Sequence, residues 1–334
     1  MIYNMWYAVL DSREVKKNKP LFAKRLNKNL VFWRDKNNNI CCIDDKCCHR
    51  GASLSHGKVC VDNIACPFHG FQFDKSGKTV IIPANGKNTE VNKNFFVSGY
   101  EVRDLYGFIW FWYGDKDKIK DKINDKIMFP DDLKDNKFSY SSIKDEWNNH
   151  YTRCIENQLD VVHVAFVHHN TIGRGNKTIV NGPLVESDED SNILKFYVNN
   201  VTDNGQKALN ASEMKKEDFK YFLYFYFPNT WQNYIFEKMR IFGVFAPVDD
   251  ENTVIYMRFY QKILNIPFIK NIINFIGKKY SDIVLKQDKN VVKTQSKKES
   301  YLGMKEEKLI PGDKPIIIYR SIRDKLKNKN NPLM

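Results

Sequence analysis

The chain has 334 residues, of which 42% are hydrophobic, 14% aromatic and 28% charged. This composition excludes a disordered, collagen-like or coiled-coil chain, and the length favours two domains. The net charge of +13 comes from 42 Lys and only 11 Arg. Proteins that read nucleic-acid sequence depend on the planar Arg side chain, so this balance indicates a Lys-rich solvated surface and no nucleic-acid partner.

The sequence contains no candidate transmembrane segment. Its longest run without a charged side chain, residues 221–236, includes Pro228 and Asn229 and is too short to span a bilayer. Asp11 and Arg13 follow closely on the first apolar residues, which does not fit a secretory signal. We therefore expect a soluble, cytoplasmic protein.

Short apolar runs separated by turn residues predict a small β domain in the first third of the chain. The expected strands are residues 21–26, 30–34, 40–44, 71–74, 79–82 and 106–113. Turn residues lie between them, as in Lys75-Ser76-Gly77, which is typical of a hairpin.

Six of the seven cysteines lie between Cys41 and Cys66, and this clustering indicates a metal site rather than a disulfide framework. Cys47 and His49 are two residues apart, and Cys66 and His69 are three apart. The sequence therefore has two short Cys/His pairs, which we expect on two separate loops.

Two such pairs suit a Rieske [2Fe–2S] centre, in which two Cys bind one iron and two His bind the other. Zinc is the alternative, since two thiolates and two imidazoles also complete a tetrahedral site. Zinc modules usually pair Cys with Cys and His with His, whereas each loop here carries one of each. Gly51 and Gly70 permit tight loops that expose the imidazoles at the tip of the cluster. The sequence therefore favours a Rieske centre.

Residues 47–55 and 64–71 resemble the Rieske domain of Rieske non-heme iron oxygenases. Two residues depart from the pattern of that family. Cys48 stands where Pro is usual, and Phe71 stands where Trp is usual. Because only Cys47 gives the Cys-x-His spacing, we interpret Cys48 as a free thiol beside the cluster.

A second group of metal-binding residue types lies in residues 156–169. Asp160 and His163 are three residues apart, so on a helix they share a face. His163 and His168 are about 140° apart around an ideal helix, so the helix has to break or widen between them if both bind one ion. The alternative is a partly buried helix with satisfied histidines. The pattern resembles the mononuclear iron motif of the same family, which implies that His163 and His168 are ligands and that Asp160 bridges towards a Rieske histidine.

The third iron ligand is expected to be an inward-facing carboxylate, because such sites usually combine two His with one carboxylate. Residues 280–295 predict a helix with Val284 and Val291 on one apolar stripe. Asp288 lies within about 40° of the centre of that stripe, where a carboxylate is costly without a cation. It also resembles the family's third ligand, whereas the competitor, Asp282, lies off the stripe.

Other parts of the C-terminal two thirds give weaker signals. Residues 221–227, 234–236, 239–247 and 254–261 predict strands. Residues 268–277 carry Ile at helical spacing with Lys around them, which suits either a membrane surface or packing within the domain. We favour packing within the domain.

The resemblance implies an α+β protein with an all-β Rieske domain over residues 1–115 and a helix-grip catalytic domain with an antiparallel sheet over residues 116–334. The chain resembles the compact oxygenases, a group that includes vanillate and dicamba demethylases, pheophorbide-type oxygenases and saxitoxin-pathway hydroxylases. This resemblance implies a monooxygenase that uses O2, one [2Fe–2S] cluster and one mononuclear Fe(II) to hydroxylate a small, ring-containing organic substrate. Demethylation, with loss of formaldehyde, is the alternative reaction, and a non-catalytic Rieske electron-transfer protein is the alternative from another class.

The sequence has no nicotinamide or flavin fingerprint, which implies a separate ferredoxin or NAD(P)H-dependent reductase as the source of electrons. Ferredoxins are typically acidic, so the net charge of +13 indicates a basic docking face. The resemblance also implies a head-to-tail homotrimer, in which the cluster of one chain feeds the iron of its neighbour.

Overall fold

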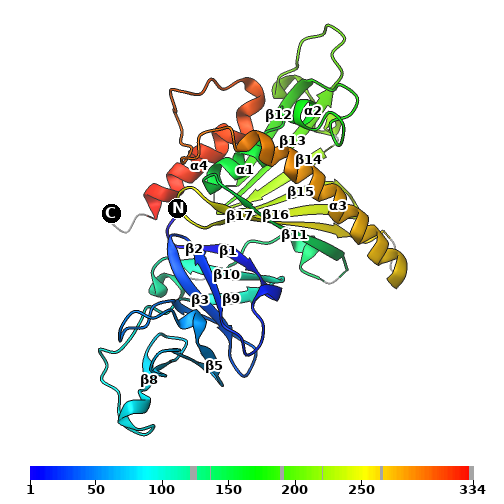
Figure 1. Cartoon of the computed structure of the whole chain (residues 1–334). Helices are drawn as coiled ribbons and strands as arrows, with labels where there is room; N and C mark the ends of the chain where they lie inside the picture. The colour runs from blue at the N-terminus through cyan, green and yellow to red at the C-terminus, as the bar shows by residue number, and fades with distance from the viewer. Residues whose placement is uncertain (121–125, 136, 189–191, 220, 264–265, 331–334) are drawn as a thin grey trace. The chain divides into compact units, whose positions relative to one another are not determined.

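The computed structural model describes residues 1–120, 126–135, 137–188, 192–219, 221–263 and 266–330. The chain forms two compact units, which are described separately (Figure 1). The N-terminal unit comprises residues 4–126 and 246–249, and the C-terminal unit comprises residues 1–3, 127–245 and 250–334. The first is built on strands and the second on one large sheet with helices, so the predicted α+β class is confirmed.

The N-terminal unit contains three small antiparallel sheets. The first consists of β1 (Met5–Asp11), β10 (Phe108–Tyr113) and β9 (Val102–Leu105). The second consists of β2 (Leu21–Arg25), β3 (Lys28–Arg34) and β4 (Ile40–Asp44), close to the predicted runs. The third consists of β5 (Lys58–Cys60), β6 (Asn63–Ala65), β7 (Gln72–Phe73) and β8 (Thr79–Ile81).

The core of this unit is shared by the second and third sheets. Trp33 and Phe73 are completely buried in it, and the indole N–H of Trp33 donates to the carbonyl of Asp62 at 3.0 Å. Cys47 and Cys66 belong to the same buried cluster. The loops that carry them leave β4 and β6, so the core anchors both Cys/His pairs.

The C-terminal unit is built on a seven-stranded sheet in the order β11-β17-β16-β15-β14-β13-β12, with antiparallel ladders. Its strands are β11 (Ser139–Trp147), β12 (Ile179–Asp188), β13 (Ile193–Val201), β14 (Tyr221–Tyr226), β15 (Thr230–Phe236), β16 (Met239–Pro247) and β17 (Thr253–Gln261). The predicted strands correspond to the last four of these, although β15 begins four residues earlier than expected.

Within the described residues, four α-helices accompany the sheet: α1 (Tyr151–Leu159), α2 (Val164–Val167), α3 (Pro267–Val292) and α4 (Lys314–Lys329). Short 3₁₀ helices lie at Ser12–Glu14, Leu54–His56, Pro83–Asn85, Lys116–Lys120, Asp131–Leu133, Ala211–Glu213, Lys216–Asp218 and Pro311–Asp313. In Figure 1, α3 runs diagonally across the sheet, and it packs against β11 and β17. α4 packs through Tyr319, whose ring lies edge-on to Phe225 of β14 at 5.2 Å.

One helix, α3, replaces the two helical segments predicted at 268–277 and 280–295. The preferred expectation that residues 268–277 pack within the domain is wrong for most of their apolar side chains, because Phe268, Ile272 and Ile276 are exposed. The reason lies on the opposite side of the helix. Gly277 is buried against β17, where a Cβ atom would lie only 2.4 Å from ring carbons of Phe259.

In the described part of the chain, no helix is both long and apolar enough to cross a membrane. The cytoplasmic location expected from the sequence stays a prediction.

Gly277→Ala should lower the stability of the C-terminal unit. Relieving the contact with Phe259 requires the ring or the helix to shift, which costs about 1–3 kcal/mol. This cost exceeds the roughly 1 kcal/mol that Ala gains over Gly in a helix. Urea unfolding should therefore show a lower midpoint for this variant. Asn271→Ala, at an exposed position of the same helix, is the matched control and should not lower the midpoint. Equal behaviour of the two variants would contradict the close packing of α3 on β17.

Candidate metal centres

The two Cys/His loops of the N-terminal unit share one backbone pattern. The N–H of Gly51 donates to the carbonyl of Cys47 at 2.9 Å, and the N–H of Gly70 donates to the carbonyl of Cys66 at 3.1 Å. Both glycines have positive φ angles, 76° and 74°, which glycine adopts without strain. Each loop therefore presents one Cys and one His from the same kind of tight turn.

The four candidate cluster ligands differ in burial, because the two cysteines are buried and the two histidines are exposed. The Cys47 and Cys66 side chains are buried, and burial raises the pKa of the Cys47 thiol to about 11 in the metal-free chain. His49 and His69 are exposed, with ring centroids 4.7 Å apart. This is the arrangement that the sequence predicts, with thiolates inside and imidazoles at the tip.

The spacing of these donors suits a two-iron cluster better than one zinc ion. The donors of a tetrahedral zinc site lie about 2.0–2.3 Å from the ion, which places them within about 4 Å of one another. Among the described residues, the one set of three His, Cys, Asp or Glu donors within 4.8 Å lies in the C-terminal unit. The donor set here, with its separate Cys and His sides, therefore fits a [2Fe–2S] group.

Both residues that depart from the family pattern adjoin these loops. The ring of Phe71 stacks flat on His49, with centroids 4.8 Å apart and planes 2° apart. Phe71 can thus support the imidazole as a larger Trp would. Cys48 is exposed, with its Sγ 3.7 Å from the Thr79 hydroxyl oxygen.

The second group of predicted ligands meets in the C-terminal unit. His163 and His168 flank the single-turn helix α2, at its N-cap and C-cap, and Asp288 lies on α3. Nε2 of His168 lies 3.0 Å from Oδ1 of Asp288, and Nε2 of His163 lies 3.5 Å from the same oxygen. These residues form the two-His, one-carboxylate set that is typical of non-heme iron sites.

The unsatisfied oxygen of Asp288 tests whether this group fits a cation. Asp288 is 3% exposed, and its Oδ1 has no hydrogen-bond partner, while Gln158 donates weakly to Oδ2 at 3.4 Å. A buried, unpaired carboxylate oxygen is costly unless a cation offsets the charge. Two imidazole nitrogens face that oxygen, so the residues fit a mononuclear divalent iron.

The electrostatics of the metal-free site lead to the same conclusion. Burial disfavours the charged form of His163, but the carboxylates of Asp160 and Asp288 outweigh burial and raise its pKa to about 9. Burial likewise opposes the charged form of Asp288, yet contacts with His163 and His168 hold its pKa well below the usual range. A bound metal requires a neutral imidazole, so metal binding at neutral pH would release a proton from His163.

The turn at Asp160 corrects the predicted helix. α1 ends at Leu159, and Asp160 is its C-cap with an extended backbone. Oδ1 of Asp160 accepts the backbone N–H groups of Val162 at 2.7 Å and His163 at 3.2 Å. The helix therefore ends before His163, and not between His163 and His168 as predicted. The reason is that the Asp160 side chain binds backbone N–H groups that a continuous helix would use. Oδ2 of Asp160 lies 3.7 Å from Nδ1 of His163, so the two residues meet across a turn and not along a helix face.

Gln287 contacts His168, and sequence reasoning missed it. Nδ1 of His168 lies 2.9 Å from Oε1 of Gln287, and the Thr171 hydroxyl donates to that oxygen at 2.8 Å. Nε2 of Gln287 donates to the Asn170 side chain at 2.7 Å, which orients the amide. Because Oε1 can accept the Nδ1 proton of His168, Nε2 of that ring would be available to bind a cation beside Asp288. Gln287 belongs to no spacing motif. Its position directly before the predicted ligand Asp288 is the one sequence feature that could have indicated a role at the site.

The buried face of α3 also differs from the predicted stripe. Asp288 is buried between Leu285 and Val292, whereas Val291 is 42% exposed. The stripe through Val284 and Val291 is therefore wrong, although Asp288 faces inwards as expected. The competitor, Asp282, pairs with Lys286 at 2.7 Å on the surface.

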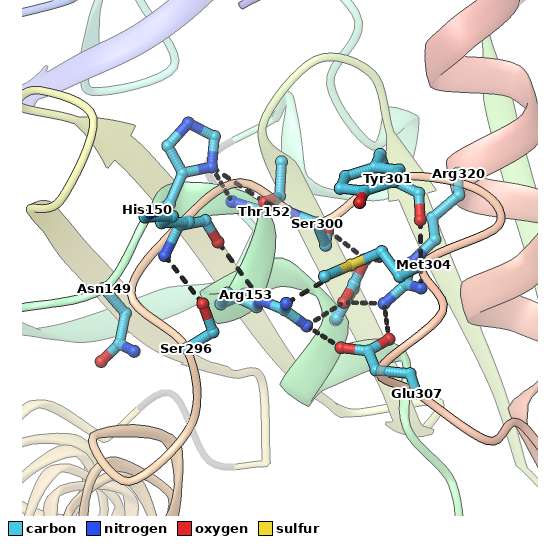
Figure 2. A network of polar contacts seen from close by, with 12 residues as sticks. Asn149, His150, Thr152, Arg153, Ser296, Ser300, Tyr301, Met304, Glu307 and Arg320 are labelled. Carbon is cyan, nitrogen blue, oxygen red and sulfur yellow. Dashed lines mark hydrogen bonds and ion pairs between the residues drawn. The ribbon is translucent and has the colours of Figure 1, made fainter.

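A polar network holds α1 in place beside α4 (Figure 2). Arg320 of α4 donates to both carboxylate oxygens of Glu156 of α1, at 2.8 Å each, and to Glu307 at 2.7 Å. Arg153, one turn earlier on α1, contacts Glu307 as well. The carbonyl of Glu156 accepts the N–H of Asp160 at 2.9 Å. The network therefore fixes the end of α1 from which the turn that carries His163 begins.

Comparison with known families identifies two domains in the chain. Residues 5–100 match the Rieske [2Fe-2S] domain, and residues 147–329 match the vanillate O-demethylase oxygenase C-terminal domain. The second match covers more than half of the chain. The protein therefore belongs to the Rieske oxygenase family, in the group that carries the vanillate O-demethylase type of C-terminal domain.

Similar curated proteins come from bacteria and plants. The chain is 30% identical over 199 residues to the vanillate O-demethylase oxygenase subunit of Pseudomonas sp. (strain HR199 / DSM 7063), a match covering 59% of this chain and 53% of that protein. It is 31% identical over 200 residues to the chloroplastic protein TIC 55 of Pisum sativum, covering 60% of this chain and 34% of that protein. The matched region thus spans about half of these relatives or less.

Solved structures share the fold over nearly the whole chain. A mutant of NdmA from Pseudomonas putida CBB5 with theobromine superposes with a TM-score of 0.79 at 23% identity, covering 97% of this chain and 90% of that one. Dicamba monooxygenase bound to dicamba gives a TM-score of 0.76 at 17% identity, covering 98% of each chain. At sequence identities of 23% and 17%, the similarity to these structures is evidence for the fold alone.

Gln287→Ala should weaken metal binding at the triad. Loss of the Oε1 acceptor frees His168 to rotate or change tautomer, and changes of this kind typically cost about 10- to 100-fold in metal affinity. Titration of the metal-free protein with Fe(II) under anaerobic conditions measures the effect. Lys286→Ala changes the neighbouring surface residue of α3 and serves as the control. If both variants bind Fe(II) like the unaltered chain, Gln287 does not orient a ligand.

Proposed function

We propose that this chain is the oxygenase component of a Rieske monooxygenase, which uses O2 and externally supplied electrons to hydroxylate a small, ring-containing organic substrate. The observation that carries the proposal is the convergence of His163, His168 and Asp288 on one buried carboxylate oxygen, in a chain that also has a Rieske domain. When bound, the cluster supplies single electrons and the mononuclear Fe(II) activates dioxygen.

Each candidate residue has a defined task in this proposal. The Rieske cluster would be held by four residues: Cys47, His49, Cys66 and His69. His163, His168 and Asp288 would hold the mononuclear iron and leave positions open for oxygen. Gln287 keeps the proton of His168 on Nδ1, and Asp160 faces Nδ1 of His163 in the same way. Carboxylates and amides in such positions fix the tautomer and orientation of a ligating imidazole.

Demethylation is a second candidate, because it is the same hydroxylation carried out at an O- or N-methyl group. The match to the vanillate O-demethylase oxygenase C-terminal domain favours it. A purely electron-carrying Rieske protein is less well supported, since such a protein has no use for a buried triad assembled from two distant segments of the chain.

The proposal includes a head-to-tail homotrimer with a Rieske domain over residues 1–115 and a catalytic domain over residues 116–334. The exposed rings of His49 and His69 support it, because another chain can reach them. Asp160 would then link a Rieske histidine of one chain to His163 of the next.

Asp160→Asn should keep both metal centres but slow the reaction by about 10- to 100-fold. The Asn side-chain oxygen can still accept the N–H groups of Val162 and His163, so the turn survives while the negative charge beside Nδ1 is lost. The measurement is the rate at which O2 and substrate reoxidise the chemically reduced cluster, tested with a panel of O- and N-methylated aromatic compounds. Asp282→Asn, a surface carboxylate on α3, is the control. Equal rates in the two variants would remove Asp160 from electron transfer.

Electron delivery should depend on salt, because the chain carries a charge of +13 and the proposed ferredoxin or NAD(P)H-dependent reductase is acidic. Raising the ionic strength from about 0.05 to 0.5 M shortens the screening length to a few ångström. Stopped-flow reduction of the cluster by an acidic ferredoxin should then slow more than substrate binding weakens. Equal effects on both would contradict an electrostatic docking face.

A further inference from the structure

The outer face of the N-terminal half of α3 carries an apolar stripe that the fold leaves uncovered. Phe268 is 75% exposed, Phe275 61% and Ile276 60%, and Ile272 and Ile283 are also exposed. At 100° per residue these side chains fall within about 100° of one another around the helix. Soluble surfaces carry single exposed apolar residues, but a continuous stripe marks an interaction site.

The opposite face of the same helix packs against the sheet, so the orientation of the exposed stripe is fixed by packing. Gly277 is pressed against the Phe259 ring, and Asn274 accepts a hydrogen bond from Gln261 of β17 at 3.3 Å. Further along, Leu285 and Asp288 are buried. The helix is therefore held with a defined face towards solvent, and Figure 1 shows this half (yellow) at the outer side of the sheet.

The charged residues around the stripe from Phe268 to Ile276 are positive, whereas Asp282, next to Ile283, is paired with Lys286 at 2.7 Å. Residues 262–281 contain four Lys and no Asp or Glu. Lys278 and Lys279 are exposed: Lys278 borders the stripe, and Lys279 lies within it, with its Nζ 5.8 Å from the centre of the Phe275 ring. A helix with an apolar Phe and Ile face bordered by Lys is the kind that lies in the interface of a bilayer and binds anionic headgroups.

We propose that this stripe docks the C-terminal unit on an anionic membrane surface, with Phe268, Phe275 and Ile276 inserted among the lipids and Lys278 and Lys279 against the headgroups. Two-fold packing against a second copy is disfavoured, because it would bring the Lys side chains of both copies together. A head-to-tail neighbour in the proposed homotrimer is the other occupant, and the oligomeric state of the stripe variant distinguishes it from a membrane. The proposal does not depend on the metal chemistry. The stripe and Asp288 share one helix, so docking would set the orientation of the metal site relative to the membrane.

Co-sedimentation of the full-length holoprotein with vesicles tests the proposal. We expect binding to vesicles of phosphatidylcholine and phosphatidylglycerol, and much weaker binding to phosphatidylcholine alone. The triple variant Phe268→Ser, Phe275→Ser and Ile276→Ser should bind the anionic vesicles at least about tenfold more weakly. Lys278→Gln with Lys279→Gln should also reduce binding, and by more at low salt than at high salt.

Phe96→Ser is the matched control, because Phe96 of the N-terminal unit is also 61% exposed. It should bind the vesicles like the unaltered chain. Failure to bind anionic vesicles, equal binding to both kinds of vesicle, or loss of binding in the control would each overturn the proposal. Sedimentation velocity without lipid gives a further check. If the triple variant alone changes the oligomeric state, another copy of the chain covers the stripe and the membrane assignment is wrong.

Discussion

The candidate catalytic site depends on one buried carboxylate. Asp288 lies buried on the inner face of α3, and among the described residues only the Nε2 atoms of His163 and His168 face its Oδ1, at 3.5 and 3.0 Å. Such a charge is unfavourable unless protons or a cation balance it. In the metal-free chain the raised pKa of His163 provides that balance, and a divalent iron would replace the proton.

Several features of the fold serve to bring these three side chains together. The Asp160 side chain ends α1 and starts the turn that delivers His163, and the single turn of α2 then carries the chain to His168. The Glu156–Arg320 pair fixes α1 relative to α4. The close contact of Gly277 with Phe259 sets the rotation of α3, and that rotation turns Asp288 inwards and the apolar stripe outwards. One packing contact thus determines both the buried site and the exposed face.

Features of the fold and the candidate sites that depend only on residues close together in the chain could be predicted from the sequence. The Cys47/His49 and Cys66/His69 pairs could be recognised because each pair lies in one short loop with its own glycine. His163 and His168 could be recognised for the same reason, but the position of the helix break could not, since it depends on a side-chain capping interaction. Helical periodicity correctly predicts that Asp288 faces inwards, but it predicts the wrong apolar neighbours, because Val291 is exposed.

The features that were missed depend on distant contacts. Gln287 acts through Thr171 and Asn170, more than a hundred residues away in the chain. β11 carries many polar residues, so its sequence does not show the pattern of a strand. It is held in the sheet by pairing with β17, over a hundred residues away in the chain. The exposure of Phe268 and Phe275 follows from how α3 packs at Gly277, and a helical spacing of apolar residues cannot distinguish an inner from an outer face.

The most direct test of the central claim is the content of iron and acid-labile sulfide in anaerobically purified protein. The account predicts about three iron atoms for two sulfides per chain, one [2Fe–2S] cluster plus one mononuclear iron. It further predicts that Asp288→Ala loses the third iron and keeps the cluster. A ratio of two irons to two sulfides in the unaltered chain, unchanged after Fe(II) is added back, would contradict the triad and leave a Rieske electron carrier.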